Sequence, residues 1–263
     1  MLFNNIINAD CIDFMKTLQN RSIDHIISDI PYARCSVYEE KIKEKIDEGK
    51  ITNKNKYLKS AKFINSSADV CDFDISDYIV EVERIAKKSI FIFADIQQIC
   101  TMRSYLECKN WKGNRLIVWH KTNALPHNFK YNYINDIEYA LYMFRETSGF
   151  NKEQTKVKGC VYQQPIYTDK NKIHPTQKPP ELVKKIIQDI TTANATILDT
   201  CAGSGEIVVD AIKLNRNAIG VEKNKTYYKK AQQRVEDLKL SALYRLCHPD
   251  DTPAVPLVKD ERH

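Results

Sequence analysis

The chain has 263 residues, of which 43% are hydrophobic and 28% are charged. That composition supports a sizeable core, excludes disorder as the default, and leads us to expect a single domain over residues 1–263. Seven glycines are too few for a collagen-like or glycine-linker protein. Lysine and arginine outnumber aspartate and glutamate by 40 to 34, a formal net charge of +6 that is compatible with a polyanionic partner.

Cysteine usage and the apolar runs exclude several other classes. The eight cysteines are scattered singly, without a C-x-x-C pair or closely spaced histidines, so we predict no metal site and no disulfide framework. No apolar run approaches the roughly 18 residues of a membrane span, and the first residues lack the features of a signal peptide. We therefore expect a cytoplasmic protein with reduced thiols and no membrane contact.

Short apolar runs alternate with segments of helical spacing along the chain. We predict strands over residues 23–28, 89–94, 115–119, 137–144, 196–198 and 218–221. Helices are expected after Ser76 as the N-cap, with Tyr78 and Ala86 on the buried face, after Pro179 and Pro180, and over a last segment that carries Tyr227, Ala231, Val235 and Leu238. Runs such as 90–93 are apolar throughout, which is typical of strands buried on both faces of a parallel sheet. The sequence therefore predicts an α/β fold with a mostly parallel, doubly wound sheet.

A basic, aromatic stretch lies between Cys108 and Asn135, where no acidic residue occurs. Cations interleaved with aromatic rings suit a nucleic-acid backbone with unstacked bases. A buried strand whose lysines face solvent is the equally weighted alternative. The candidate DNA contacts are Lys109, Lys112, Arg115, Lys121 and Lys130 in this stretch, and Lys156 and Lys158 in a later polar segment.

Two closely spaced glycines follow a predicted strand. Residues 196–206 (T-I-L-D-T-C-A-G-S-G-E) have the pattern of a strand, a tight turn and a helix start, and glycine lets backbone N–H groups approach a ligand closely. The next strand ends at Glu222, a carboxylate placed to accept hydrogen bonds from ribose hydroxyls. The third glycine of a dinucleotide fingerprint is absent, and Asp199 suits an α-ammonium group better than a pyrophosphate. The pattern favours S-adenosylmethionine as the ligand.

A second group of candidate functional residues stands at the end of the predicted strand at 23–28. Residues 26–32 (I-I-S-D-I-P-Y) form an apolar run followed by an acid, a proline and an aromatic residue. The Asp29 carboxylate and the Ile30 carbonyl are suited to accept hydrogen bonds from an exocyclic amine, and Tyr32 to stack on a base flipped out of a duplex. A strand followed by an ordinary proline turn is the alternative interpretation.

Six landmarks, which run along the chain at 8–10, 29–32, 119–121, 137–139, 174–179 and 199–205, resemble in type and order those of the β class of amino-group DNA methyltransferases. D-I-P-Y at 29–32 resembles their D-P-P-Y signature, and D-T-C-A-G-S-G at 199–205 resembles their D-P-F-x-G-S-G cofactor motif. H-P-T-Q-K-P at 174–179 matches the element before it, while N-A-D at 8–10, W-H-K at 119–121 and I-E-Y at 137–139 fall where the family has N-x-D, W-x-K and H-E-x-I. The resemblance spans roughly residues 4–240 and implies a Rossmann-like methyltransferase fold with a circularly permuted motif order, catalytic motif first.

The resemblance implies an S-adenosylmethionine-dependent enzyme that methylates N6 of a flipped adenine in DNA, because Asp29 rather than serine favours adenine. It implies a charged loop at about 33–75, which closes over the base, and a target-recognition segment at about 120–173. A homodimer and a cognate restriction enzyme are left open as further partners. The implied catalytic residues are Asp29, Ile30, Pro31 and Tyr32. The implied cofactor residues are Asp10, Asp29, His174, Thr176, Lys178, Asp199, Cys201, Ala202, Gly203, Ser204, Gly205 and Glu222, with Thr176 and Lys178 near the methionine carboxylate and His174 orienting its turn.

Two departures from the family pattern carry expectations of their own. Ile30 replaces the first proline, which predicts a slightly looser loop with activity retained, and Cys201 replaces a phenylalanine, which predicts weaker cofactor binding. The alternative functions are an N4-cytosine DNA methyltransferase, a protein glutamine methyltransferase, and a degenerate homologue that binds DNA without catalysis. The motif order argues against the glutamine enzyme, in which the cofactor motif normally precedes the tetrapeptide.

Overall fold

Residues 3–32, 73–126, 130–131, 133–145, 158–170 and 172–247 are described by a computed structural model of the chain. The strands are β1 (Asn5–Ile7), β2 (Ile23–Asp29), β3 (Ala86–Phe93), β4 (Lys112–Lys121), β5 (Ile137–Phe144), β6 (Val161–Gln164), β7 (Thr196–Asp199) and β8 (Asn217–Val221). The helices are α1 (Cys11–Lys16), α4 (Ile75–Ile85), α5 (Ile96–Cys108), α6 (Pro180–Ile190), α7 (Glu206–Lys213) and α8 (Lys225–Cys247). The charged loop is described only at its last residues, 73–75.

The strands form one sheet in the order β1-β8-β7-β2-β3-β5-β4-β6. Within the described chain, β5 runs antiparallel to both of its neighbours, and the other pairings are parallel. The predicted mostly parallel α/β sheet is therefore confirmed. Because β5 is reversed, its amino end lies at the edge of the sheet where the other strands have their carboxyl ends. Ligands of open α/β sheets bind at that edge.

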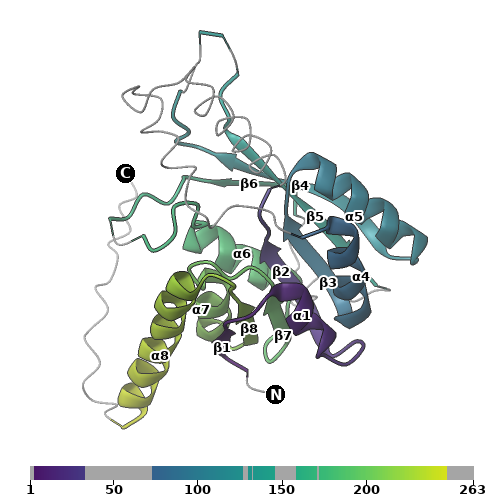
Figure 1. The fold of residues 1–263 in the computed structure, drawn as a ribbon. Helices are drawn as coiled ribbons and strands as arrows, with labels where there is room; N and C mark the ends of the chain where they lie inside the picture. Colours follow the sequence, from purple (N-terminus) through teal and green to yellow (C-terminus); the bar gives the residue numbers. More distant parts are fainter. Residues whose placement is uncertain are drawn as a thin grey trace, which may run out of the picture.

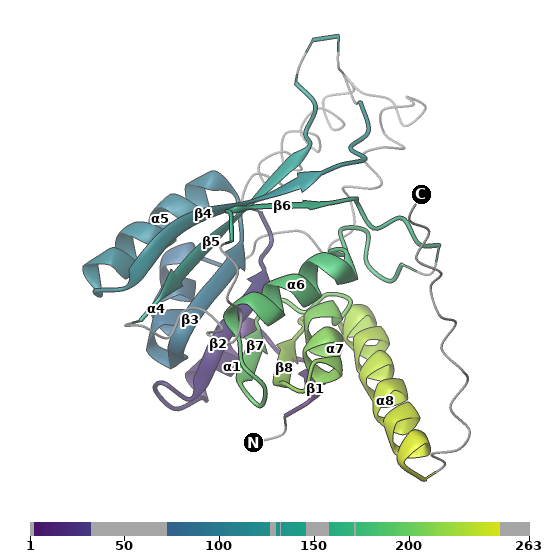
Figure 2. The same cartoon turned by 180° about the vertical axis from the view of Figure 1, so that it is seen from behind.

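Helices cover both faces of the sheet, as a doubly wound fold requires (Figures 1 and 2). On β3, Ile90 and Ile92 belong to a hydrophobic cluster shared with α1, α4 and α5. Phe91 and Phe93 point to the other face and join a cluster with α6, α7 and α8. Both sets are nearly inaccessible to solvent, so the apolar run at 90–93 is explained by burial on two faces.

Two helix starts show how local sequence sets the boundaries. Pro180 occupies the first turn of α6, as predicted. The predicted N-cap of α4 was wrong: Asp74 caps this helix, and its carboxylate accepts a hydrogen bond of 2.6 Å from the Ser76 amide. Ala86, expected on the helix face, instead begins β3, which is three residues longer at its amino end than the predicted strand.

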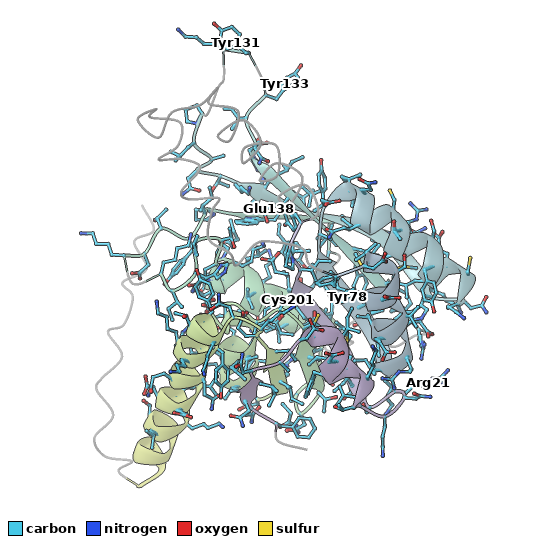
Figure 3. The ribbon with its side chains drawn as sticks, viewed as in Figure 1. Arg21, Tyr78, Tyr131, Tyr133, Glu138 and Cys201 are labelled. Atoms are coloured by element: carbon cyan, nitrogen blue, oxygen red, sulfur yellow. The ribbon has the colours of Figure 1, made fainter. Side chains whose placement is uncertain are left out.

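Beyond the sheet, the ends of β4 and β5 continue into an extension that projects from the body (Figure 1). Tyr131 and Tyr133 in this extension are 91% and 96% exposed. Figure 3 shows both at its far end, well away from Glu138 and Cys201. In the described part of the chain, no helix is both long and apolar enough to cross a membrane.

Candidate functional site

A cavity of about 430 Å³ opens where the carboxyl ends of β2, β7 and β8 meet the segment before α6. It brings both predicted constellations together, although they are far apart in the sequence. Its lining includes Asp10, Asp29, Ile30, Pro31, Tyr32, His174, Thr176, Lys178, Asp199, Cys201, Ala202, Gly203, Ser204 and Glu222. Gly205, also predicted to bind the cofactor, lies behind this lining, where an added Cβ would come within 3.1 Å of the Ala231 side chain. A volume of this size is typical of small-molecule and cofactor sites.

The loop after β2 is held by two hydrogen bonds from neighbouring elements. The Ile30 amide donates to the Phe93 carbonyl at the end of β3 over 3.1 Å. The Gln98 side chain on α5 donates to the Pro31 carbonyl over 2.9 Å. A proline at position 30 has no N–H for the first bond. Ile30 therefore supplies a main-chain hydrogen bond that proline lacks, and its side chain is only 1% exposed. The slightly looser loop expected from the sequence stays a prediction.

Opposite charges meet around Lys178 in the cavity lining. Its ammonium lies 2.5 Å from Asp29 Oδ2 and 2.9 Å from Glu138 Oε2. Lys121 reaches the other Glu138 oxygen at 2.9 Å, and the Tyr32 hydroxyl donates to Glu138 Oε2 over 2.9 Å. The resemblance placed Lys178 near a methionine carboxylate, but the structure pairs its ammonium with two carboxylates of the protein.

The charges in this cluster stabilise one another. Burial tends to raise the pKa of Glu138, but the ammonium groups of Lys178 and Lys121 outweigh it and lower this pKa to about 2. Burial tends to lower the pKa of Lys178, yet Asp29 and Glu138 raise it above its usual value. Glu138 and Lys178 are therefore both charged at neutral pH.

Glu138 is the main residue that sequence reasoning missed. It stands in the I-E-Y segment that resembles a family landmark, but no role was predicted for it. Its place follows from the reversed direction of β5, which puts Glu138 at the carboxyl edge beside Asp29. Strand direction is not readable from the apolar pattern of 137–144.

The glycine turn differs from its predicted role. Gly203 and Gly205 have positive φ angles of 51° and 74°, in the left-handed region that favours glycine. Their amides donate within the protein, Gly203 to Glu222 Oε2 over 2.8 Å and Gly205 to the Ala202 carbonyl over 2.7 Å. The backbone conformation, rather than amides aimed at a ligand, is therefore what these two positions require.

Two carboxylates mark the end of the cavity nearest β1 and β8. Glu222 accepts bonds from the amides of Gly203 and Asn224, at 2.8 Å and 2.7 Å. Burial raises the pKa of Glu222. Asp10 caps α1 by accepting from the Ile12 amide over 3.0 Å, and Lys223 approaches its other oxygen at 3.2 Å. Carboxylate oxygens have several acceptor positions, so these contacts leave capacity for ligand hydroxyls or amines.

Asp199 lies at the end of β7, almost fully buried. Burial raises its pKa to about 7, and the nearby Asp29 and Glu222 carboxylates add to the rise. Asp199 accepts hydrogen bonds from the Ser28 hydroxyl at 2.9 Å and the Cys201 amide at 3.3 Å. These two bonds act against the rise and lower the pKa of Asp199. Ser28 was not predicted as a site residue. A buried carboxyl with a raised pKa is suited to a cationic ligand, which would favour its charged form.

Side chains within the H-P-T-Q-K-P segment contact one another. The Thr176 hydroxyl lies 3.0 Å from His174 Nδ1. Burial, together with Lys178 and Lys172, lowers the pKa of His174 to about 4, so the ring is neutral at pH 7. Gln177 donates to Glu206 on α7 over 2.6 Å, which ties this segment to the glycine turn. The arrangement agrees with an orienting rather than a proton-transferring His174.

The basic residues predicted to contact DNA do not form one patch. Lys121 is buried in the ion pair with Glu138, which does not suit a phosphate contact. Lys112 begins β4 and Lys121 ends it, a separation of roughly 30 Å at the usual rise of a strand. Lys109 and Arg115 are exposed toward the Lys112 end, away from the cavity, whereas Lys130 is exposed on the extension with Tyr131. Lys158 pairs with the buried Asp189, and Lys156 lies outside the described residues.

Trp119 in β4 and Trp111 just before this strand are buried, so the alternative of a core strand holds for the part of the stretch in β4. Sequence neighbours along a strand alternate between faces and spread over its length, which is why the charge pattern did not predict a surface. In the part of the chain that the structure describes, no group of three or more His, Cys, Asp or Glu side chains is placed to hold a metal ion.

Comparisons with known proteins identify the family of this chain. The profile of the N6_N4_Mtase family, described as DNA methylase, matches residues 23–233. The chain is 27% identical over 259 residues to the type II methyltransferase M.HinfI of Haemophilus influenzae, covering 90% of this chain and 69% of that protein. It is 28% identical over 252 residues to the type II methyltransferase M2.MboI of Moraxella bovis, covering 89% and 88%.

Solved structures show the same fold. The M1.HpyAVI–SAM complex superposes with a TM-score of 0.63 at 24% identity, covering 88% of this chain and 98% of that one. The cytosine-N4-specific PvuII DNA methyltransferase gives a TM-score of 0.62 at 13% identity, covering 92% and 91%. The predicted Rossmann-like methyltransferase fold is confirmed. Since the family profile spans most of the sequence, this chain belongs to the N6/N4 DNA methylase family.

Proposed function

We propose that this DNA methylase transfers a methyl group from S-adenosylmethionine to N6 of an adenine flipped out of a DNA duplex. The observation that carries the proposal is a cavity lined both by the tetrapeptide at 29–32 and by Gly203 and Ser204 of the glycine turn. A methyl donor in one half and a base in the other would share this space.

The residues present fit the cofactor. Glu222 and Asp10 offer acceptors at one end of the cavity, for ribose hydroxyls and the adenine amine of the cofactor. Asp199, with its raised pKa, suits the α-ammonium group. When bound, S-adenosylmethionine supplies an electrophilic methyl group on a sulfonium. His174 and Thr176 would complete the wall on the methionine side.

The chain's own residues position the target amine. The Asp29 carboxylate and the Ile30 carbonyl accept hydrogen bonds from the exocyclic NH2, which points the nitrogen lone pair toward the methyl group. Tyr32 stacks on the face of the flipped base. Transfer is then accelerated chiefly by orientation and exclusion of water, and the extra proton leaves the nitrogen after the methyl group has been transferred.

Adenine is proposed over cytosine because Asp29 stands where serine would favour the N4 reaction. The fold does not separate the two, because the cytosine-N4-specific PvuII enzyme has a comparable TM-score of 0.62. N4-methylation of cytosine is the second candidate. The exposed tip with Lys130, Tyr131 and Tyr133 belongs to the proposed target-recognition segment at about 120–173. We keep one catalytic domain over residues 1–263 as part of the proposal.

Transfer of a labelled methyl group from S-adenosylmethionine to unmethylated DNA tests the proposal. The wild-type protein should label DNA, and Asp29→Ala should abolish labelling while its melting temperature and cofactor binding show a folded protein. Labelling by Asp29→Ala at the wild-type rate would show that Asp29 is not the acceptor. No labelling of DNA by the wild-type protein would favour the degenerate, DNA-binding alternative.

A further inference from the structure

Glu138 contacts three of the side chains around the proposed base site. Its Oε2 accepts from the Tyr32 hydroxyl and from the Lys178 ammonium, each over 2.9 Å. Its Oε1 accepts from Lys121 over 2.9 Å. One carboxylate therefore joins the end of β4, the loop after β2 and the segment before α6.

Lys178 extends this connection to Asp29. Its side chain is 7% exposed, and its ammonium lies 2.5 Å from Asp29 Oδ2. It also lies over the rings of Phe93 and Trp119, at 4.9 Å and 5.8 Å from their centroids. A buried ammonium in an apolar setting is strongly held by its carboxylates, because separating it from them leaves an uncompensated charge. The position of Lys178 therefore fixes one oxygen of Asp29.

We propose that Glu138 is a positioning residue for methyl transfer, an inference that rests on the proposed function. Glu138 sets the Tyr32 ring directly through the phenol and sets the Asp29 carboxylate through Lys178. The two groups that meet the target base are thereby fixed before the base enters. Glu138 itself acts through Tyr32 and Lys178.

The charge of Glu138 matters as well as its shape. Asp29 and Glu138 carry two negative charges, and Lys178 and Lys121 carry two positive charges. With a glutamine at position 138, Asp29 becomes the carboxylate that balances Lys178 among the contacts described here. The ammonium then competes more strongly with the target amine for Asp29. We therefore expect slower transfer rather than weaker cofactor binding.

A second cluster elsewhere in the protein offers a matched control. Asp189 on α6 is also buried, accepts from the Tyr162 hydroxyl over 2.8 Å, and pairs with Lys158. It therefore has the same kinds of partner as Glu138, a phenol and an ammonium. Asp189 does not line the cavity. Replacing it by asparagine repeats the loss of a buried charge away from the reaction.

The test compares Glu138→Gln with Asp189→Asn in methyl transfer to DNA and in cofactor binding. We expect Glu138→Gln to lower kcat by about 10- to 100-fold, the scale of a small misplacement of reacting groups, with the Kd of S-adenosylmethionine changed less than about twofold. Asp189→Asn should keep kcat within about twofold of the wild-type value. Equal kcat for the two variants, or a loss explained by cofactor Kd alone, would overturn the inference.

Tyr32→Phe separates positioning from general destabilisation, because it removes only the hydroxyl that Glu138 holds. It should lower kcat without changing the cofactor Kd, and Glu138→Gln should cost less in this background than in the wild type, since both changes break one contact. If the double variant lost kcat by the full product of the two single-variant losses, the inference would be contradicted. If Glu138→Gln does not fold, a wild-type kcat for Tyr32→Phe is sufficient to overturn it. A wild-type protein that methylates no DNA defeats the proposed function instead.

Discussion

The ammonium group of Lys178 lies 2.5 Å from the carboxylate of Asp29, across 149 positions of sequence. This contact joins the segment before α6 to the loop that ends β2. It places the catalytic tetrapeptide and the H-P-T-Q-K-P element in one site, although the first stands near the start of the chain and the second follows most of the sheet. The permuted motif order is thus compatible with a single cavity.

Cofactor binding should depend on pH through Asp199. Its pKa is raised to about 7, and only the ionised form attracts an α-ammonium group. The Kd of S-adenosylmethionine should therefore rise by up to about tenfold per pH unit as the pH falls below 7. Titration calorimetry from pH 5.5 to 7.5 measures this, with Asp199→Asn as the control that removes the dependence. A flat wild-type profile would show that Asp199 does not face the ammonium.

Acid should remove the stabilisation that Glu138 provides. The pKa of Glu138 is lowered from 4.5 to about 2 by its two lysines, so its contribution is full above about pH 4.5 and is lost as the pH falls to about 2. Urea unfolding of wild type and Glu138→Gln should show a stability difference at pH 6 that shrinks by pH 3. A difference that does not change with pH would contradict the charged state assigned to Glu138.

DNA affinity should depend on the extension rather than on the far end of β4. Lys130 is exposed beside Tyr131, whereas Lys109 is exposed just before the start of β4, a strand whose two ends are roughly 30 Å apart by its rise. Lys130→Gln should reduce the slope of log K against log salt by about 0.9, the loss of one phosphate contact, and Lys109→Gln should leave it unchanged. Fluorescence anisotropy across a salt series compares the two. An equal change for both variants would place DNA elsewhere.

An aromatic ring at position 201 should tighten cofactor binding. Cys201 lines the cavity where the family pattern has phenylalanine, and Phe73 also lines it. A further ring should lower the Kd of S-adenosylmethionine by about 2- to 10-fold, the scale of one aromatic contact. Equilibrium binding of S-adenosylmethionine to Cys201→Phe checks this. A Kd equal to that of the wild type would count against the expectation that cysteine at position 201 weakens cofactor binding.

Apolar periodicity predicted β2, β3, β4, β5, β7 and β8 but not the short edge strands β1 and β6, and the motifs predicted many of the residues that line the cavity. The run at 90–93 is apolar because β3 is buried on two faces, and Pro180 begins α6 as its position implies. Glu138 was missed because its role depends on the direction of β5. Lys121 was predicted to contact DNA because a run of positive charge does not report which face of a strand a side chain occupies. Its partner Glu138 is 17 positions away in the sequence.

Mass spectrometry of nucleosides tests the central claim most directly. Unmethylated DNA is incubated with the wild-type protein and S-adenosylmethionine carrying an isotopically labelled methyl group, then digested to nucleosides. The account predicts label in N6-methyladenine and its absence with Asp29→Ala. Label in N4-methylcytosine would contradict the choice of adenine, and no labelled base from a folded protein that binds the cofactor would contradict methylation of DNA itself.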